Sequence, residues 1–350
     1  MRTVTVNASK SYDIKIGPGL LSTLGAEAKH LGKAKKIALV SETNVCPIYG
    51  RQAEDSLMRA GFDVVSFVFP AGEASKCAAT YLELLNFLAE NKLTRTDMIV
   101  ALGGGVVGDL AGFAAATYLR GIRFIQIPTT LLAAVDSSVG GKTAIDLSAG
   151  KNLVGAFYQP SLVVCDLNTL KTLPDTVFSD GCAEVIKYGI LYDADLFEKL
   201  SNEGLNFDRE YVISRCIALK RDVVAEDEFD TGARQKLNLG HTIGHSIELC
   251  SNFSISHGQA VAIGMAIVSK AGVAFKHCDL SVYNQLIPVL KKFQLPYLTD
   301  YTSKQLYENA LSDKKRLGAF VNLIIPNSIG VCSIVPTPVD KLESFIQEGL

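Results

Sequence analysis

The stretch MIVALGGGVVGDLAGFAAATYL, residues 98–119, contains in order an apolar strand, a glycine-rich turn and an apolar helix. We expect the strand at Met98–Leu102, the turn at Gly103–Asp109 and the helix at Leu110–Leu119. A continuous apolar run of this length is typical of a strand that is buried on both faces of a parallel sheet. The stretch therefore indicates a domain in which parallel strands alternate with helices.

Similar segments flank this stretch on both sides. Further strands are predicted at Lys36–Val40, Val64–Phe69, Phe124–Ile127 and Leu162–Cys165, with helical patterns at Pro47–Ala60 and Thr80–Asn91. Because short strands alternate with helices, the first half of the chain is predicted to be a doubly wound α/β domain of Rossmann type.

From about residue 173 the pattern becomes helical. Helices are predicted at Thr176–Leu200, Phe207–Ala225, Leu239–Leu249, Gly258–Phe275 and Ser281–Phe293, and the next clear strand is Phe320–Ile325. A chain of 350 residues has room for about two domains. We therefore predict an α/β N-terminal Rossmann-like parallel-sheet domain at residues 1–174 and a mainly α-helical C-terminal domain at residues 175–350.

Composition and charge exclude several classes of protein. The apolar fraction of 48% and the charged fraction of 20% are close to globular averages and exclude a mainly disordered chain. The net charge of −2 argues against nucleic-acid binding by bulk charge. No segment resembles a membrane helix or a signal peptide, so we expect a cytoplasmic protein with no membrane partner. The eight cysteines are scattered without a CxxC motif, which predicts reduced core residues.

The glycine-rich turn contains the pattern GxGxxG at Gly103, Gly105 and Gly108. Glycines between a strand and a helix let backbone N–H groups approach a pyrophosphate, so the turn indicates a dinucleotide site. The acidic residue expected about 20 positions further on is missing, and a turn needed only for packing stays possible. The later sequence Gly140-Gly-Lys-Thr143 lacks the first glycine of a P-loop, because Asp136 stands there.

Three of the five histidines, His241, His245 and His257, fall within 17 residues. His241 and His245 are four residues apart on one predicted helix and share a face, with Glu248 about one turn further on. This spacing alone predicts a metal or acid–base site in which His241 and His245 are the paired ligands.

Lysines and arginines accompany both motifs. Each of them alone could be a solvated surface charge, but in glycine-rich or apolar surroundings such cations are candidates for binding an anion. The candidates are Lys142, Lys151, Lys187, Lys220, Arg234, Lys314 and Lys315. Arg234 and Asn238 are expected one helical turn apart, just before His241. Together with a metal and a dinucleotide, these cations indicate a small, anionic, hydroxylated substrate.

Long blocks of the chain resemble the 3-dehydroquinate synthases of the sugar phosphate cyclase family. The blocks are Pro70-Ala-Gly-Glu-Ala-Ser-Lys76, Gly103–Asp109, Pro128–Asp146, Lys151-Asn-Leu-Val-Gly-Ala-Phe157, Ala183-Glu-Val-Ile-Lys187, Leu237–His245 and His257-Gly258. The resemblance runs from Lys36 to Lys315, which is nearly the whole chain.

The resemblance implies a lyase of the shikimate pathway that uses NAD and a divalent Zn²⁺ or Co²⁺. Its reaction converts 3-deoxy-D-arabino-heptulosonate 7-phosphate to 3-dehydroquinate and phosphate, through transient oxidation by NAD, β-elimination, reduction and an intramolecular aldol closure. It also implies a homodimer and a small sugar-acid phosphate as the substrate.

The resemblance further assigns residues to roles. It implies Glu184, His241 and His257 as metal ligands, which leaves His245 as an acid–base residue and corrects the assignment from spacing. The implied substrate and catalytic residues are His245, Lys142, Asn152, Lys187, Lys220, Arg234, Asn238, Arg120, Asp136, Lys314 and Lys315. The implied NAD contacts are Glu42, Asn44, Ala71, Gly72, Glu73, Ala74, Ser75, Lys76, Gly104, Gly105, Val106, Val107, Gly108, Asp109, Thr129, Thr130, Lys142, Lys151, Thr169, Leu170, Lys171 and Thr172.

Two positions depart from the family pattern. Glu42 stands where an aspartate is usual, and its longer carboxylate can still reach a ribose hydroxyl. Gln259 replaces the usual glutamate after His257-Gly258, which removes a charge expected close to the metal and could alter metal affinity.

Three other functions are alternatives to this one. Related cyclases make 2-deoxy-scyllo-inosose, valiolone-type products or aminodehydroquinate, and the first two have substrates without a carboxylate; Arg234 and Asn238 favour a carboxylate. A metal-dependent polyol dehydrogenase would accumulate NADH. A non-catalytic NAD-binding or scaffold protein is disfavoured because every expected metal and cation position is retained.

Overall fold

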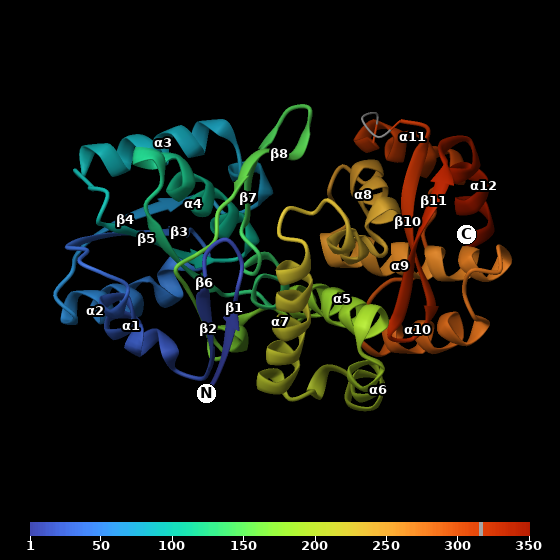
Figure 1. Cartoon of the computed structure of the whole chain (residues 1–350), viewed down its shortest axis with the longest axis horizontal. Helices are drawn as coiled ribbons and strands as arrows, with labels where there is room; N and C mark the ends of the chain where they lie inside the picture. The colour runs from blue at the N-terminus through green and yellow to red at the C-terminus, as the bar shows by residue number, and fades with distance from the viewer. Residues whose placement is uncertain (315–317) are drawn as a thin grey trace. The chain divides into compact units, whose positions relative to one another are not determined.

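The structure is a computed structural model that describes residues 1–314 and 318–350, without the side chains of residues 312–314 (Figure 1). The chain divides into two compact units. Unit 1 comprises Met1–Pro174 and Arg209–Phe229, and unit 2 comprises Asp175–Asp208 and Asp230–Leu350. The expected division after residue 174 thus coincides with a change of unit, but residues 209–229, which were expected in the second domain, group with the first.

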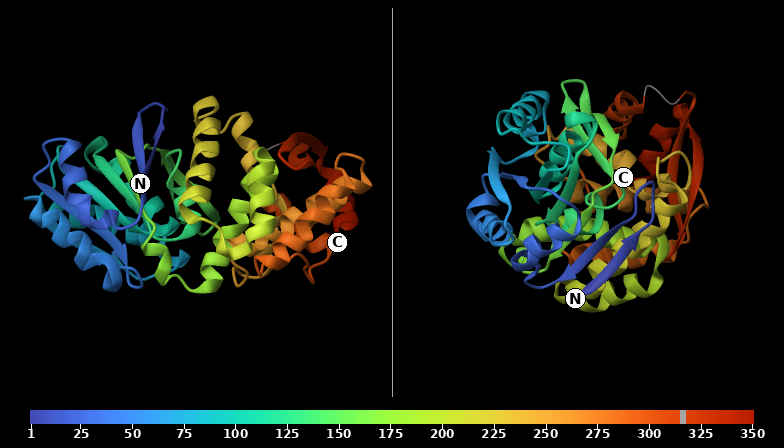
Figure 2. Two further views of the ribbon diagram at one scale, coloured as in Figure 1. Left: turned by 90° about the horizontal axis from the view of Figure 1, so that it is seen from below. Right: turned by 60° about the vertical axis from the view of Figure 1, so that its left-hand side comes forward.

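Unit 1 is built on a seven-stranded sheet in the order β1-β2-β9-β6-β5-β3-β4. The strands are β1 Arg2–Val6, β2 Tyr12–Gly17, β3 Lys36–Glu42, β4 Asp63–Phe69, β5 Met98–Gly103, β6 Arg123–Pro128 and β9 Leu162–Asp166. β1 pairs with β2 antiparallel, and all the other pairs are parallel. Figure 2 shows β1 and β2 as a blue ribbon that starts at the N-terminus. The parallel α/β sheet predicted from the sequence is confirmed.

Helices cover both faces of this sheet, with α1 and α2 on one face and α3 and α4 on the other (Figure 1). Their bounds are α1 Leu24–His30, α2 Arg51–Arg59, α3 Ala78–Glu90 and α4 Gly105–Thr117. Strand residues alternate between the two faces, as the pleat requires. In β3, for example, Ile37 and Leu39 belong to the apolar cluster that includes α1 and α2, whereas Ala38 and Val40 belong to the cluster that includes α3 and α4.

The remaining elements of unit 1 carry several candidate site residues. β7 Lys142–Leu147 and β8 Gly150–Phe157 form a separate antiparallel hairpin. The helix α7 Arg209–Glu226 contacts β1 and the π-helical turn η5 Ala133–Ser137. Other short turns are η1 Leu20–Thr23, η2 Cys46–Gly50, η3 Glu73–Ser75, η4 Tyr118–Arg120 and η6 Thr169–Thr172.

Unit 2 is mainly helical. Its elements are α5 Asp175–Tyr192, α6 Ala194–Glu203, η7 Gly204–Asn206, η8 Ala233–Asn238, α8 His241–Cys250, α9 His257–Ala274, α10 Leu280–Lys292, α11 Ser303–Lys314, β10 Phe320–Ser328, β11 Val331–Pro338 and α12 Val339–Gly349. β10 and β11 form an antiparallel hairpin that packs beside α9 and α12 (Figure 2). α5 and α9 are buried along most of their length and form the centre of the unit.

The helix predicted at Thr176–Leu200 is two helices. α5 ends at Tyr192, and Asp193 begins α6 by accepting a hydrogen bond from the N–H of Leu196 at 3.0 Å. Aspartate is among the preferred N-cap residues, because its carboxylate satisfies an N–H group that has no partner inside the helix. The apolar pattern continues through both helices and therefore does not mark the break.

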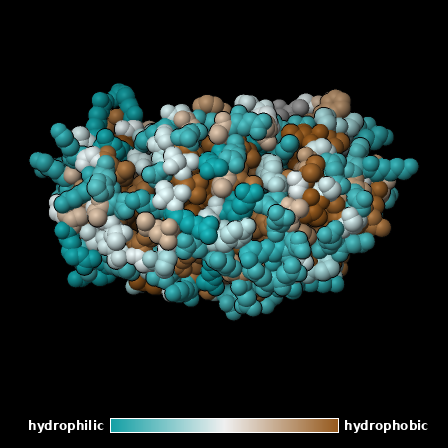
Figure 3. Space-filling view, turned by 60° about the horizontal axis from the view of Figure 1, so that its bottom comes forward, coloured by the Kyte–Doolittle hydropathy of each residue, from teal (hydrophilic) through white to brown (hydrophobic). Residues whose placement is uncertain are grey.

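The distribution of hydrophilic and hydrophobic side chains between surface and core agrees with the composition. On the face in Figure 3 hydrophilic residues predominate, and hydrophobic residues occur in smaller patches among them. All eight cysteines are free thiols, and Cys165, Cys182, Cys216, Cys278 and Cys332 are buried. Within residues 1–314 and 318–350, no helix is both long and apolar enough to span a membrane.

Candidate active site

Three side chains from three helices of unit 2 form a cluster with the donor set of a metal site. Glu184 lies in the middle of α5, His241 is the first residue of α8 and His257 is the first residue of α9. The Nε2 atoms of His241 and His257 lie 3.5 and 3.6 Å from Oε1 of Glu184. One potential ligand atom from each residue lies within 4.8 Å of the others. Two imidazole nitrogens and one carboxylate oxygen are ligands that suit Zn²⁺ or Co²⁺.

Glycines allow α8 and α9 to approach closely enough to build this cluster. Gly240, directly before His241, has a left-handed backbone with φ 78°. A Cβ on Gly264 of α9 would lie 2.1 Å from the carbonyl oxygen of Gly240, and a Cβ on Gly240 would lie 2.7 Å from the carbonyl oxygen of Val261. No larger residue fits at either place without moving a helix, so these glycines set the distance between His241 and His257.

Burial and charge set the protonation of the two histidines. Burial, and next the charge of Lys187, lower the pKa of His241 well below its ordinary value, which favours the neutral imidazole that binds metals. Burial would also lower the pKa of His257, but hydrogen bonds and charge from Glu184 and Glu248 outweigh it and raise that pKa to about 10. His257 must therefore give up a proton when a metal binds.

His245 lies beside this cluster but groups with different partners. Its ring centroid is 5.5 Å from that of His241 and 6.1 Å from that of His257. Potential ligand atoms of His245, Glu248 and His257 also lie within 4.8 Å of one another, and Nδ1 of His257 is 3.4 Å from Oε2 of Glu248. The spacing of four residues does place His241 and His245 side by side, but Glu184 joins His241 to His257 instead. The partner from α9 depends on tertiary packing, which the spacing cannot report.

Two predicted cations of unit 2 are buried. Lys187 is next to this cluster, and Arg234 is near it in sequence. Lys187, one turn after Glu184 in α5, forms an ion pair with Glu184, and both side chains are 1% exposed. Arg234 in η8 is 2% exposed, whereas Asn238 at the end of η8 is exposed. The segment is a 3-10 helix with three residues per turn, so residues four apart do not share a face. The expectation that Arg234 and Asn238 are one turn apart on a helix is wrong for that reason.

Part of the predicted phosphate-binding set is not described. Lys315 lies outside the described residues, as does the side chain of Lys314 at the end of α11. Their predicted contact with substrate therefore stays a prediction.

In unit 1 the predicted NAD contacts follow the carboxyl ends of parallel strands. Glu42 ends β3, the segment Ala71–Lys76 follows β4, Thr129 follows β6 and η6 follows β9. The carboxyl ends of parallel strands lie at one edge of a sheet, where nucleotides bind in open α/β folds. The carboxylate of Glu42 accepts hydrogen bonds from the N–H groups of Asn44 and Val45, at 2.6 and 3.1 Å. It therefore shapes the turn after β3.

The glycine-rich turn connects β5 directly to α4. α4 begins at Gly105, five residues earlier than predicted, so Val106–Asp109 lie in its first turns. A Cβ on Gly104 would lie 3.1 Å from Cγ2 of Thr130, and the glycine keeps this space open. The start of a helix offers free N–H groups and a positive dipole to an anion, which suits the pyrophosphate of a dinucleotide.

Charged residues from three segments of unit 1 meet near this turn. Nζ of Lys76 lies 2.7 Å from Oδ2 of Asp109 and 3.7 Å from Oε1 of Glu73, and Nζ of Lys151 lies 3.8 Å from the same Glu73 oxygen. Burial raises the pKa of Asp109 in spite of the nearby charge of Lys76. For Lys76, burial would lower the pKa, but the charges of Asp109 and Glu73 outweigh it and raise the pKa above its ordinary value. The four residues Glu73, Lys76, Asp109 and Lys151 were all predicted as NAD contacts.

The other predicted substrate residues of unit 1 divide into a pair and three separate positions. Lys220 of α7 donates to Oδ1 and to the carbonyl oxygen of Asp136, at 2.7 and 2.6 Å, and is 4% exposed. Arg120 is exposed and ends the η4 turn after α4 with a left-handed backbone, φ 67°. Lys142 begins β7 and Asn152 lies in β8, and both are exposed. Asp146 was not predicted as a site residue, although it ends the block Pro128–Asp146 on which the family resemblance rests.

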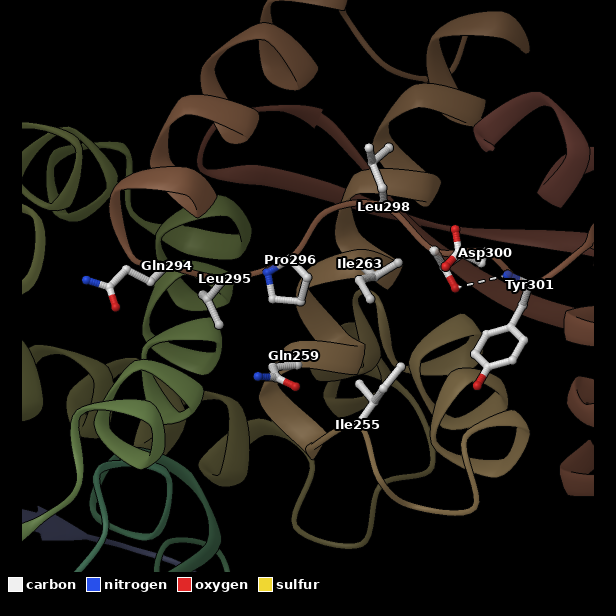
Figure 4. Close-up of a pocket in the computed structure, with 10 residues that line it drawn as sticks. Ile255, Gln259, Ile263, Gln294, Leu295, Pro296, Leu298, Asp300 and Tyr301 are labelled. Carbon is white, nitrogen blue, oxygen red and sulfur yellow. Dashed lines mark hydrogen bonds between the residues drawn. The ribbon is translucent and has the colours of Figure 1, made fainter.

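A separate hollow of unit 2 contains none of the predicted site residues (Figure 4). Its volume is about 770 Å³, and its walls are Ile255, Gln259, Ile263, Gln294, Leu295, Pro296, Leu298, Thr299, Asp300 and Tyr301. The Gln259 side chain, which replaces the usual glutamate of the family, lines this hollow together with apolar residues.

Comparison with known proteins agrees with the resemblance in the sequence. Residues 66–180 match the family model "3-dehydroquinate synthase N-terminal" and residues 181–316 match "3-dehydroquinate synthase C-terminal". A curated 3-dehydroquinate synthase of Enterococcus faecalis is 42% identical, over 99% of this chain and 99% of its own length.

Two solved structures share the fold over the whole chain. A 2-deoxy-scyllo-inosose synthase in complex with carbaglucose-6-phosphate, NAD⁺ and Co²⁺ has a TM-score of 0.89 and 26% identity, with 100% of each chain covered. The 2-epi-5-epi-valiolone synthase ValA of Streptomyces hygroscopicus subsp. jinggangensis, with NAD⁺ and Zn²⁺ bound, has a TM-score of 0.88 and 25% identity, with 100% of this chain and 99% of that chain covered. With two family models and a full-length curated relative in agreement, this chain belongs to the 3-dehydroquinate synthase family.

Proposed function

We propose that this enzyme converts 3-deoxy-D-arabino-heptulosonate 7-phosphate to 3-dehydroquinate and phosphate, with NAD and one divalent metal as recycled cofactors. The observation that carries the proposal is the cluster of Glu184, His241 and His257 in a chain whose full-length relative is a curated 3-dehydroquinate synthase. The reaction has no net redox change, so the cofactor must be restored within each turnover.

The donor chemistry of the cluster fits a metal. Glu184, His241 and His257 would hold Zn²⁺ or Co²⁺, the ions bound to the two related cyclases. Three protein ligands leave a position for substrate oxygen, as in catalytic metal sites. When bound, the metal supplies a Lewis acid for hydroxyl and ketone oxygens of the sugar. Lys187 balances the buried charge of Glu184, and Glu248 holds Nδ1 of His257 so that Nε2 faces Glu184.

Unit 1 fits a dinucleotide. Gly104 and Gly105 leave room beside Thr130 and Ser137 that a Cβ would narrow, and α4 starts at this place. We assign the pyrophosphate to this turn and the remaining NAD contacts to Glu42, Asn44, Glu73, Lys76, Lys151 and the η6 turn. When bound, NAD supplies a hydride acceptor that returns the hydride later in the same turnover.

Basic side chains would fix the two anionic ends of the substrate. The guanidinium of Arg234 is buried and suits a planar carboxylate, which it can bind through two parallel hydrogen bonds. We assign phosphate binding to Lys187, Asn238, Arg120 and one of Lys314 and Lys315. Lys142, Asn152 and the Asp136–Lys220 pair would bind the substrate further. Binding a flexible sugar acid at many points supplies orientation, which is a large part of the rate enhancement available to an enzyme.

His245 is our candidate for moving protons. It stands next to His241 and His257 but is not a member of the Glu184 group. Histidine is a common general acid and base in enzymes. We therefore assign His245 to acid–base and hydrogen-bonding work and not to the metal.

A carboxylate substrate distinguishes this proposal from the related cyclases. The two structural neighbours are synthases of 2-deoxy-scyllo-inosose and 2-epi-5-epi-valiolone. A buried guanidinium is suited to bind a planar carboxylate through two parallel hydrogen bonds. Arg234 therefore favours the sugar acid. A homodimer, implied by the family, is part of the proposal and can be tested by light scattering, and a cytoplasmic location stays a prediction.

The experiment follows phosphate release and NADH absorbance in one sample that contains the sugar acid phosphate, with NAD and Zn²⁺ in catalytic amounts. Stoichiometric phosphate without accumulating NADH supports the proposal. Steady accumulation of NADH would instead identify a dehydrogenase. Absence of phosphate, combined with turnover of a carboxylate-free sugar phosphate, would identify another cyclase.

A further inference from the structure

Asp146 lies where the β7–β8 hairpin departs from regular pairing. β7 and β8 pair in register from Lys142 to Ile145, and the register shifts between Ile145 and Leu147. Asp146 therefore does not take part in the ladder. Its backbone N–H instead donates to the carbonyl oxygen of Lys76 at 2.7 Å, and the residue forms a bridge with Cys77. An irregularity of this kind redirects the backbone and often adjoins a functional site.

The side chain of Asp146 binds the far side of the same hairpin. Its Oδ1 accepts a hydrogen bond from the backbone N–H of Asn152 at 2.7 Å. Asn152 has a left-handed backbone, φ 56°, which is unfavourable for a residue other than glycine. The hydrogen bond helps to maintain this conformation and leaves the exposed Asn152 side chain available to a ligand.

Asp146 also contacts the charged residues that precede Cys77. Burial, and further the charge of Glu73, raise the pKa of Asp146 above its ordinary value, against the hydrogen bond from Asn152 and the charge of Lys76. Oε1 of the same Glu73 lies 3.8 Å from Nζ of Lys151 and 3.7 Å from Nζ of Lys76. Asp146 thus joins two segments: its side chain binds the turn that carries Lys151 and Asn152, and its backbone N–H binds the segment that carries Glu73 and Lys76.

From this geometry we propose that Asp146 is a positioning residue, which holds Asn152 and Lys151 in the arrangement that binds substrate and NAD. The inference rests on the proposed function, because it assigns those two residues to the ligands. It adds a residue to which neither the family resemblance nor the comparisons give a role. Asp146 acts through the backbone of Asn152, and does not itself need to touch the substrate.

The test compares D146A with D146N in the full-length chain. Asparagine keeps an acceptor oxygen for the N–H of Asn152, whereas alanine does not. We expect D146A to raise the KM for the sugar acid phosphate about tenfold or more, and D146N to stay within about threefold of the parent. The matched control is D97A, because Asp97 also accepts backbone N–H groups in a turn of unit 1, from Lys35, Lys36 and Thr94. D97A should lower stability without changing KM.

A second measurement does not depend on catalysis. Limited trypsin digestion, read by mass spectrometry, should show faster cleavage after Lys151 in D146A than in the parent, D146N or D97A. Should D146A fail to fold, D146E replaces it, since the extra methylene group displaces the acceptor while the charge is kept.

The proposal is overturned if D146A is folded and has the KM and the cleavage pattern of the parent. It is equally overturned if D146N is as impaired as D146A, because the loss of charge and not of the acceptor would then be responsible. If the parent itself releases no phosphate, the proposed function fails. The rate of trypsin cleavage after Lys151 still decides whether Asp146 holds the turn: cleavage should be faster in D146A and return to the parent rate in D146N.

Discussion

At the scale of single residues, Glu184 joins the ionisable groups of the unit 2 cluster. Two histidine Nε2 atoms lie within 3.6 Å of its Oε1, and Lys187 forms an ion pair with it. A carboxylate that is 1% exposed is costly to bury unless cations or metals compensate its charge. The neutral state favoured for His241 is the state in which an imidazole can bind a metal. The chemistry of the cluster is thus set by burial as much as by residue type.

Removing the buried guanidinium of Arg234 should reduce substrate recognition. We expect R234A to lower kcat/KM about 100-fold or more, because the substrate carboxylate loses a charged bidentate partner. R234K should recover only part of this loss, since an ammonium group cannot reproduce the fork geometry. Steady-state kinetics measure both variants, with K236A in the same η8 segment as the control. Kinetics of R234A near those of the parent would remove Arg234 from the carboxylate site.

The sequence alone predicted part of this site for good physical reasons. The spacing of His241 and His245 reports a shared helix face, and their rings do lie 5.5 Å apart. It could not report that α9 brings His257 to Glu184, because that approach depends on contacts between elements far apart in sequence. The assignment of Glu184, His241 and His257 as metal ligands came from the family resemblance. Asp146 was missed because its role depends on a hydrogen bond to a backbone group.

At the scale of elements, close contact between α8 and α9 is the condition for the cluster. Gly240 and Gly264 face each other where the two helices meet, with no room for a Cβ. Their small size lets the first residue of α8 and the first residue of α9 both reach Glu184 on α5. The geometry of the donor set is therefore as sensitive to these glycines as to the ligands.

A methyl group at Gly264 should separate the two helices. G264A places a Cβ 2.1 Å from the carbonyl oxygen of Gly240, so we expect a loss of roughly 1–3 kcal/mol in the free energy of unfolding from overpacking. Metal affinity should fall as well, because the distance between His241 and His257 changes. Denaturant unfolding and metal competition measure the two effects, with K270A on α9 as the control. A variant with the stability and metal affinity of the parent would show that the contact is not limiting.

Elements that are apolar throughout were the easiest to predict. The strands β3, β4, β5, β6 and β9 each contain a predicted strand. In β3, β5, β6 and β9, burial on both faces leaves a continuous apolar run. The start of α4 was placed too late because glycine is a poor helix former. These glycines are closely packed, since a Cβ on Gly105 would lie 3.3 Å from Oγ of Ser137 and a Cβ on Gly108 would lie 3.3 Å from Nε2 of Gln126. The β7–β8 hairpin was missed because its second strand is largely exposed and lacks that signal.

At the scale of the whole molecule, the order of the chain and the order of the units differ. The chain leaves unit 1 at residue 174, returns to it with α7 and leaves it again after Phe229. Composition changes once, near residue 173, and α7 has a helical pattern like the segments around it. A single boundary was therefore the natural prediction. The return of the chain brings Lys220 of α7 to Asp136 within unit 1, where both are proposed to bind the substrate.

The stability of the molecule should depend on the turn that Asp97 closes. Burial would raise the pKa of Asp97, but hydrogen bonds from Lys36, Thr94 and Lys35 outweigh it and lower that pKa. A carboxyl group whose pKa is lowered by folding adds stability above its unfolded pKa, and this stability disappears as the pH falls through the folded pKa. We expect D97N to lose about 1–3 kcal/mol at pH 7. The free energies of unfolding of the parent and D97N should converge when the pH falls below the ordinary pKa range of a carboxyl group. A constant difference between them down to acid pH would contradict this account.

The central claim is that Glu184, His241 and His257 bind the metal while His245 does not. The most direct measurement is the metal content of the purified parent and of its H241A, H245A and H257A variants, determined after equal exposure to Zn²⁺. We predict about one Zn²⁺ per chain in the parent and in H245A, with H245A inactive, and little or none in H241A and H257A. Loss of the metal in H245A together with its retention in H257A would contradict the account and would favour the ligand pair read from helical spacing.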